Sequence, residues 1–388
     1  MSLSGVKCLD VTHQIAGPWT SELLSDLGAE VIKIENPKGG DTSRSYPFFG
    51  NSVFATENRG KKSVTINLKS DRGREIFTKL ARQSDILVEN FAPGLLDRLG
   101  LGYEDLNKAN PRLIYCSISG YGKSSSMGNR PAWDAVVQAI SGLMTLTGEP
   151  DRLPMRAGTS IVDLTAANYA LNAILLSLLE REKTGKGRFV DISLFDSAIS
   201  LVNYWIAYSS ITGKTPVRMG NEWPAFAPYQ VFKARNGEHL FIGASNEEFW
   251  KELCGVLKLE SLAADENFST NDRRVHNMKK LSSIIDEVTE SWDRDELVER
   301  LTEKGIPNAP VNSVREVLDD PTLLNRKVLV ETSYESDNFR VASSPLHVFG
   351  PTTTGTSPPK LGQHTNEILK ELGYETHEIE EFHRDGII

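Results

Sequence analysis

The sequence contains little cysteine and no cysteine motif. Its 388 residues include only Cys8, Cys116 and Cys254, which are widely spaced and odd in number. This pattern argues against a disulfide framework and against a cysteine-based zinc site. Cys8 and Cys116 lie in apolar runs typical of buried strands, where free cysteine packs as a small hydrophobic side chain. We therefore predict reduced cysteines and a cytoplasmic protein.

Motifs for metal ions, nucleotides and serine hydrolases are missing as well. The seven histidines are scattered without HxH or HExxH spacing, and no GxSxG sequence occurs. The turn SISGYGKSSS has Ser117 where a phosphate-binding loop needs glycine, and THQIAGPW has one glycine where a dinucleotide site needs three. We predict no metal ion and no nucleotide cofactor.

Long apolar runs and an excess of positive charge are also absent. The start, MSLSGVKCLDVT, lacks the features of a secretory signal, so we expect no signal peptide. The charge-free run 164–179 contains polar residues such as Asn168 and Asn172 and is short for a membrane span. With 43 basic and 52 acidic residues, the net charge is −9. We therefore expect no nucleic acid and no membrane as partner.

The first half of the chain alternates strand and helix patterns. Apolar, β-branched runs predict strands at 6–12, 29–35, 63–68, 85–90, 113–119 and 188–194. Helical patterns lie between them, at 18–28, 71–83, 94–108, 132–145, 164–183 and from Asp196 onward. Near-continuous apolar strands alternating with helices indicate an α/β fold with a parallel sheet covered on both faces. In such sheets ligands bind beyond the carboxyl ends of the strands.

The pattern changes after about residue 211. A turn-rich linker at 212–224 precedes a hairpin pattern around Asn236-Gly237, followed by helical segments. We interpret 225–325 as a smaller α+β domain, followed by a short linker at 326–329. The Pro/Thr/Gly-rich segment 351–362 is expected to run extended, and two amphipathic helices end the chain.

Basic residues follow several of the predicted strands. Singly, each is most often a solvated surface charge. Together, near strand ends in an acidic chain, they are candidates for a pocket that holds a polyphosphate-bearing ligand. The set comprises Lys38, Arg44, Arg59, Lys61, Lys62, Lys69 and Arg98.

Asp163 is a lone carboxylate before an almost uncharged helical run. Aspartate is a favoured N-cap, so it has a purely structural interpretation. However, Ile161 and Val162 precede it, whereas a surface cap needs no apolar neighbours. A carboxylate held at a helix N-terminus is expected to stay ionised and oriented, as a nucleophile or base requires. The residues alone leave both interpretations open.

The motifs in combination are similar to those of class III coenzyme A transferases. This family includes formyl-CoA and carnitine CoA-transferases and is related to α-methylacyl-CoA racemase. The similarity runs almost from end to end, and its most specific parts are VENFAPGLLDRLG and KTGKGRFVDISLFDSA. It also covers LDVTHQIAGP, ENRGKKSVTINLKS, AGTSIVDLTAA and LGQHTNEILKELG.

The resemblance implies roles for particular residues. The family's nucleophile is an aspartate at the position of Asp163, and Asp134 matches an acidic residue beside it. Asp134 also has a structural interpretation, as a cap for the helix over 135–145. The implied coenzyme A contacts are Ala16, Ile66, Asn67, Leu68, Lys69, Asn90, Phe91, Ala92 and Arg98.

The resemblance also implies an architecture. The family has a Rossmann-like large domain and a smaller one, in two ring-shaped subunits interlinked as a homodimer. Here the large domain would comprise 1–211, completed by 330–388. Coenzyme A and acyl-CoA would be substrates, with no permanently bound cofactor.

Two departures limit what can be carried over. Residues that contact the cofactor in formyl-CoA transferase are replaced by Ile15 and Asn36. The racemase branch carries a His-Asp pair after the Gly-Tyr-Gly turn, but this chain has Trp133 before Asp134. Tryptophan cannot carry a proton at neutral pH, so transfer is favoured over isomerisation.

We therefore predict an acyl-CoA:carboxylate CoA-transferase that forms an aspartyl anhydride and then an aspartyl-CoA thioester on Asp163. The alternatives are an isomerase of the racemase type and a non-catalytic CoA-binding protein. Small carboxylic acids would be the acceptors, and a small dicarboxylic acid with succinyl-CoA as donor is the first guess, from resemblance alone.

Overall fold

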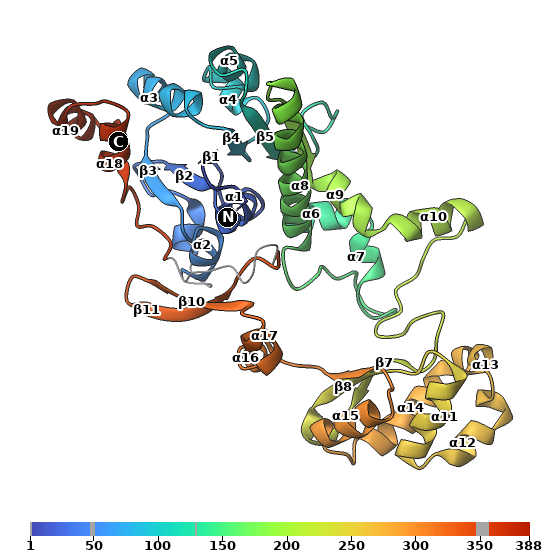
Figure 1. The fold of residues 1–388 in the computed structure, drawn as a ribbon. Helices are drawn as coiled ribbons and strands as arrows, with labels where there is room; N and C mark the ends of the chain where they lie inside the picture. The colour runs from blue at the N-terminus through green and yellow to red at the C-terminus, as the bar shows by residue number, and fades with distance from the viewer. Residues whose placement is uncertain (1, 47–50, 129, 347–356) are drawn as a thin grey trace. The chain divides into compact units, whose positions relative to one another are not determined.

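The computed structural model describes residues 2–46, 51–128, 130–346 and 357–388 (Figure 1). The chain divides into two compact units. Unit 1 runs to Leu143, from Arg156 to Thr212 and from Asp320 to Ile388, and unit 2 comprises Met144–Met155 and Gly213–Asp319. Residues 144–155, which we had placed in the large domain, therefore group with unit 2, and 320–329 group with unit 1.

Unit 1 is built on a six-stranded parallel sheet, as the alternating pattern predicted. The strand order is β3-β2-β1-β4-β5-β6, so the direction of strand addition reverses between β1 and β4. Cys8 of β1 is flanked by Val31 of β2 and Ile86 of β4. The strands are β1 (Lys7–Asp10), β2 (Glu30–Glu35), β3 (Lys62–Thr65), β4 (Ile86–Glu89), β5 (Ile114–Ser119) and β6 (Phe189–Ser193).

Helices cover both faces of this sheet because alternate strand residues point to opposite sides (Figure 1). One apolar core joins the sheet to α1, α6, α8 and α9, and a second joins it to α3, α4, α5, α18 and α19. On the first face lie α1 (Ala16–Asp26), α6 (Asp134–Ile140), α8 (Ile161–Thr184) and α9 (Leu194–Leu201). On the second lie α3 (Asp71–Arg82), α4 (Leu95–Arg98), α5 (Tyr103–Ala109), α18 (Thr365–Glu371) and α19 (Thr376–Arg384).

Two further parts of unit 1 differ from expectation. A short helix, α2 (Ser52–Glu57), precedes β3, and a hairpin of β10 (Leu329–Tyr334) and β11 (Asp337–Ala342) precedes the C-terminal helices. Neither was predicted. Of the predicted linker 351–362, residues 351–356 lie outside the described residues.

The single helix predicted over 132–145 is two helices. The first of them, α6, ends at Ile140. The second, α7 (Leu143–Leu146), follows Gly142, whose φ of +87° interrupts the helical path. A left-handed φ suits glycine because it has no Cβ.

Unit 2 contains a three-stranded antiparallel sheet and a set of helices. The predicted hairpin is confirmed, because β7 (Tyr229–Lys233) and β8 (His239–Gly243) pair across a turn in which Asn236 has a φ of 61°. The remaining elements are β9 (Asn308–Pro310), α11 (Glu247–Leu257), α12 (Glu260–Ala264), α13 (Asn271–His276), α14 (Met278–Thr289), α15 (Arg294–Glu303) and α16 (Val314–Val317). After unit 2, α17 (Pro321–Asn325) begins the return to unit 1.

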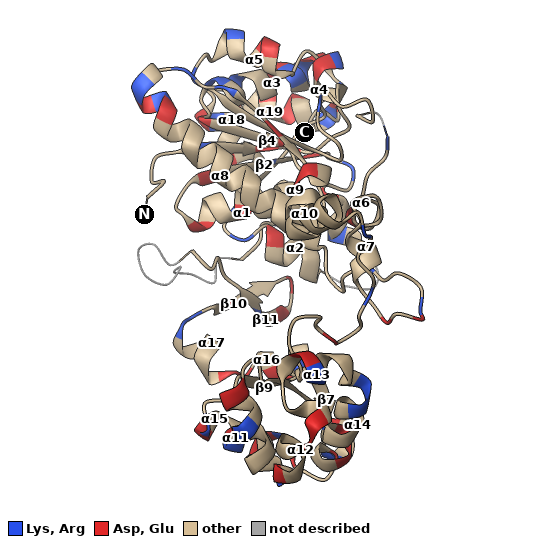
Figure 2. Ribbon diagram, turned by 90° about the vertical axis from the view of Figure 1, so that its right-hand side faces the viewer, with Lys and Arg blue, Asp and Glu red and all other residues tan. Residues whose placement is uncertain are grey.

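Helix α8 begins three residues earlier than predicted and is long and apolar. By length and composition it could cross a membrane, yet 39% of its apolar window is buried inside the protein, and core helices of soluble proteins pass the same test. Apart from Asp163 in the first turn, the charged residues of α8 lie at its C-terminal end. Helix α10 (Asn203–Thr212) has no charged residue and is entirely tan in Figure 2.

Candidate active site

Asp163 occupies the third position of α8, not the N-cap that we had considered for it. Ser160 is the N-cap residue, and its side chain makes no capping hydrogen bond. The carboxylate of Asp134 takes over that function. Its Oδ2 accepts hydrogen bonds from the backbone N–H groups of Val162, at 2.7 Å, and Asp163, at 3.2 Å. A carboxylate from another helix thus satisfies two free N–H groups at the beginning of α8.

Asp134 does not cap its own helix either, because α6 begins at Asp134 itself with Trp133 as the N-cap residue. One turn later, Gln138 donates a hydrogen bond from its Nε2 to Asp134 Oδ1. The same amide accepts, through Oε1, a hydrogen bond from Ala157 N at 2.8 Å. The beginning of α8, the beginning of α6 and the segment before α8 are therefore held together through one buried carboxylate.

The Asp163 carboxyl group is less acidic than an ordinary aspartate. Burial, and then the negative charge of Asp134, raise its pKa from 3.8 to about 7. The expectation that the helix N-terminus keeps this carboxylate fully ionised is therefore wrong. Burial and a like charge together bring the titration of Asp163 close to neutral pH.

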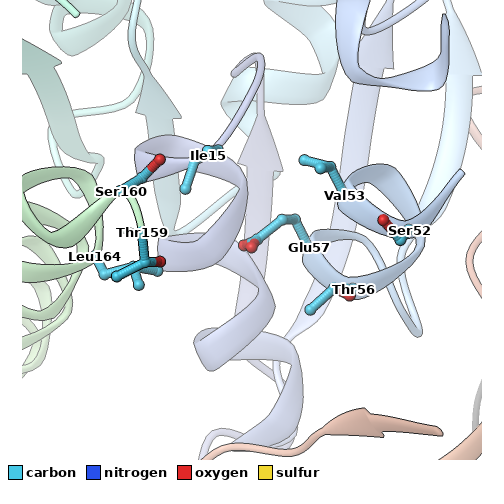
Figure 3. A pocket seen from close by; sticks show the side chains of 8 residues that line it. All are labelled: Ile15, Ser52, Val53, Thr56, Glu57, Thr159, Ser160 and Leu164. Carbon is cyan, nitrogen blue, oxygen red and sulfur yellow. The ribbon is translucent and has the colours of Figure 1, made fainter. Parts of the chain in front are cut away.

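A cavity of about 200 Å³ opens beside the first turn of α8 (Figure 3). The nearby ends of three elements form its wall, namely the beginning of α1, helix α2 and the segment that enters α8. Its lining residues are Ile15, Ser52, Val53, Thr56, Glu57, Thr159, Ser160 and Leu164. The contributions of α2 were missed in the sequence because VFATE contains no recognisable motif.

Most of the residues predicted to contact coenzyme A follow strands at the carboxyl edge of the sheet. Ile66, Asn67, Leu68 and Lys69 come directly after β3, and Asn90, Phe91 and Ala92 follow β4. Ala16 is the first residue of α1, and Arg98 ends α4. Parallel strands bring their carboxyl ends to one edge, so the fold gathers these segments there.

Two of these segments are joined where the strand order reverses. Asn90 Oδ1 accepts from His13 N at 2.9 Å, and Asn90 Nδ2 donates to His13 O at 2.8 Å. The Phe91 ring packs edge-on against the His13 ring, with centroids 5.3 Å apart. The loops after β1 and β4 are thus fixed to each other at the position where open α/β sheets bind ligands. The roles of the individual contact residues stay predictions.

The predicted cluster of basic residues does not form a single cationic pocket. Four of the seven side chains are committed to acidic partners: Lys61 with Asp10, Arg59 with Glu22, Arg44 with Glu35 and Lys62 with Glu30. Lys38, Lys69 and Arg98 are exposed and make no ion pair with a described residue. Sequence spacing did not reveal the pairing because the acidic partners come from other elements.

Comparison with known proteins identifies the family of the chain. CoA-transferase family III matches residues 3–365. The chain belongs to CoA-transferase family III. It is a CoA-transferase, and enzymes of this family use CoA thioesters as substrates.

Similar proteins span nearly the whole chain. The human succinyl-CoA:glutarate CoA-transferase is 37% identical over 393 residues, covering 100% of this chain and 90% of that protein. The acetyl-CoA:oxalate CoA-transferase of Acetobacter aceti is 37% identical over 374 residues, or 95% of each chain. A crystal structure of a CaiB/BaiF family protein from Brucella suis matches with a TM-score of 0.89 at 35% identity, covering 95% of this chain and 99% of that chain.

The pKa of Asp163 leads to a prediction about pH. If the Asp163 carboxylate is the attacking group, the rate of its acylation by an acyl-CoA falls as pH drops below about 7, because protonation removes the nucleophile. In Asp134→Asn the like charge is removed, so the midpoint shifts to lower pH but stays above 3.8 because burial is the larger cause. Single-turnover CoA release across about pH 5–9 measures both midpoints. Identical midpoints in the two proteins would contradict this account.

Proposed function

We propose that the protein transfers coenzyme A from an acyl-CoA donor to a carboxylic acid acceptor, with Asp163 as the covalent carrier. The observation that carries this proposal is the arrangement of Asp163, which lies in the first turn of α8, beside a cavity, with a second carboxylate at its backbone N–H. A carboxylate of raised pKa is a stronger nucleophile than an ordinary aspartate and is still partly ionised at neutral pH.

The reaction would proceed in two exchanges without a net change in protons. The Asp163 carboxylate attacks the thioester carbonyl, the C–S bond breaks, and an aspartyl acyl anhydride and CoA thiolate form. The thiolate attacks the aspartyl carbonyl, the anhydride C–O bond breaks, and the donor acid leaves. The acceptor carboxylate then attacks the aspartyl-CoA thioester, and the same steps in reverse release the new acyl-CoA and free Asp163.

Asp134 would act as a positioning residue in this scheme. Its hydrogen bonds orient the first turn of α8, and its negative charge disfavours the ionised form of Asp163. Acylation removes the charge of Asp163, which relieves this repulsion, so Asp134 favours the covalent intermediate over the free carboxylate.

Backbone N–H groups at the start of α1 are candidates for the oxyanion hole. Helix α1 has no side-chain cap at Ile15, and the N–H groups of Ile15 and Ala16 have no acceptor among the described residues. Ile15 lines the same cavity as Ser160 and Leu164 of α8. Free N–H groups at a helix N-terminus stabilise a developing negative charge on a carbonyl oxygen.

We propose short dicarboxylic acids as the substrates, with the implied contact residues holding coenzyme A. The support comes from relatives that are named for succinyl-CoA and glutarate, at 37% identity, and for succinyl-CoA and mesaconate, at 35%. The exposed cations Lys69 and Arg98 suit the phosphate groups of coenzyme A. A cytoplasmic location stays a prediction.

A homodimer is part of the proposal. Helices α8 and α10 expose large apolar side chains of a kind that a monomer rarely gathers. They are Tyr169 at 45%, Leu176 at 66%, Leu179 at 65%, Tyr204 at 58% and Ile211 at 84% exposure. Burying such side chains against a second copy of the chain would remove them from water. The interlinked arrangement of the two chains is implied by the resemblance alone.

The decisive test of the proposed function is an exchange assay. Wild-type protein is incubated with succinyl-CoA and glutarate, and glutaryl-CoA formation is measured. In Asp163→Asn the amide cannot form the anhydride, so we expect a loss of at least about 10³-fold at unchanged fold. Glu22→Gln, a buried carboxyl that pairs with Arg59 outside the cavity, is the control and should keep its rate.

Full activity in Asp163→Asn would rule out this carrier. Exchange of the α-proton of an acyl-CoA into solvent without acyl transfer would support the isomerase alternative, and binding of acyl-CoA without either reaction would support a non-catalytic protein.

The dimer is tested by light scattering. The chain has a mass of 43.0 kDa, so we expect a particle of about twice that mass, and a shift toward 43.0 kDa in the double variant Leu176→Glu, Leu179→Glu. A wild-type protein that stays monomeric at all concentrations would exclude the dimer.

A further inference from the structure

Glu57 is the one carboxylic acid among the residues that line the cavity. It ends helix α2, and only 7% of its surface is exposed. Its Oε2 is buried without a hydrogen-bond partner, and no described residue forms an ion pair with it. Figure 3 shows the side chain extending from α2 toward the side of the cavity formed by α1 and α8.

An unpartnered buried carboxyl group calls for an explanation because it costs stability. Among neighbouring buried acids, Asp10 accepts from Lys61, Ser21 and Thr12, and Glu22, whose oxygens also have no hydrogen-bond partner, forms an ion pair with Arg59. Glu57 has no ion pair with a described residue. The apolar residues Ile15 and Val53 line the same cavity, so an apolar side chain of similar size would be compatible with this wall.

The rest of the cavity wall has hydroxyl groups and apolar side chains. Thr56, Thr159 and Ser160 contribute hydroxyls, and none of the described lining residues is lysine or arginine. Burial raises the pKa of Glu57 well above its usual range, with Lys61, Glu22, Asp163 and Arg59 as weaker influences. Burial without a hydrogen-bond partner for Oε2 therefore favours the neutral form of the carboxyl group, which has an O–H to donate.

We propose that Glu57 is a specificity-determining residue whose carboxyl O–H donates a hydrogen bond to the distal carboxylate of a short dicarboxylic acyl group in this cavity. This inference rests on the proposed function and adds how the far end of the substrate is recognised. A hydrogen bond from a neutral acid to a carboxylate is charge-assisted and short, and the threonine and serine hydroxyls supply further donors.

The size and charge of the cavity agree with this assignment. A volume of about 200 Å³ corresponds to about seven water molecules, which suits a chain of a few carbon atoms. Acylation removes the charge of Asp163, so its repulsion of the distal carboxylate, which is present when the donor binds, is relieved in the covalent intermediate. An ionised Glu57 would instead repel the substrate.

The test compares two donors of equal chain length, succinyl-CoA and butyryl-CoA, with glutarate as the common acceptor. In Glu57→Met the apolar side chain keeps the length but removes the donor. We expect the kcat/KM ratio of succinyl-CoA to butyryl-CoA to fall about 10- to 100-fold, the effect of losing one hydrogen bond to a charged group. Glu57→Gln retains an N–H donor and should restore most of the ratio, and Glu22→Gln should leave it unchanged.

Folding is checked by the melting temperature, which should be equal or higher in Glu57→Met because a buried unpaired carboxyl is removed. If that variant does not fold, Glu57→Ala removes the same donor without a bulky replacement. An unchanged ratio in both variants, or an equal loss with both donors, would overturn the assignment. A wild-type enzyme that transfers CoA but prefers butyryl-CoA or 3-hydroxybutyryl-CoA would also overturn it and leave the proposed function intact, whereas no transfer with any donor would contradict the proposed function itself.

Discussion

The hydrogen bonds from the first turn of α8 to the Asp134 carboxylate are the interaction on which the site depends. They replace the N-cap that Ser160 does not provide, and they join α6, the segment around Ala157 and α8 through one buried group. Because the acceptor is a charged carboxylate, the same contact that orients Asp163 also raises its pKa. Asp134 therefore contributes to both the position and the pKa of the candidate nucleophile, while burial is the larger cause of the raised pKa.

The sheet supplies the rigid support that such an arrangement needs. Asp163 and the cavity lie at elements packed on a parallel sheet whose interior includes a buried ionic network. In that network Lys33 and Lys61 both lie near Asp10, and their charges hold the pKa of Asp10 far below its usual range. The paired carboxylates of this network support the fold. Burial raises the pKa values of Asp163 and Glu57, as it does those of Glu22 and Glu89. What distinguishes Asp163 and Glu57 is their place at the cavity, where Glu57 lines the wall and Asp163 lies between the lining residues Ser160 and Leu164.

The sequence predicted the sheet well because strand and helix patterns are local. All six strands of the parallel sheet and the Asn236-Gly237 turn were found from apolar periodicity and turn residues, whereas the β10-β11 hairpin was not. Contacts between distant segments could not be predicted in the same way. The partner of the α8 N-terminus is Asp134, 29 residues before Asp163. Four of the seven basic residues predicted to form a cationic pocket instead make ion pairs with acids on other elements. Helix α2 and Glu57 escaped notice because an acid in a short, motif-free helix is normally a surface residue.

The central claim is that Asp163 itself becomes acylated, and the mass of its peptide tests this most directly. The protein is mixed with succinyl-CoA, quenched with hydroxylamine and digested with a protease. The mass of the peptide that contains Asp163 is then measured by mass spectrometry. Attack of hydroxylamine on an aspartyl anhydride or an aspartyl-CoA thioester converts the side chain to a hydroxamate, about 15 Da heavier than the acid. The account predicts this mass shift on Asp163 in the wild type, dependent on the acyl-CoA and absent in Asp163→Asn. An unmodified Asp163 peptide in an enzyme that is turning over would contradict it.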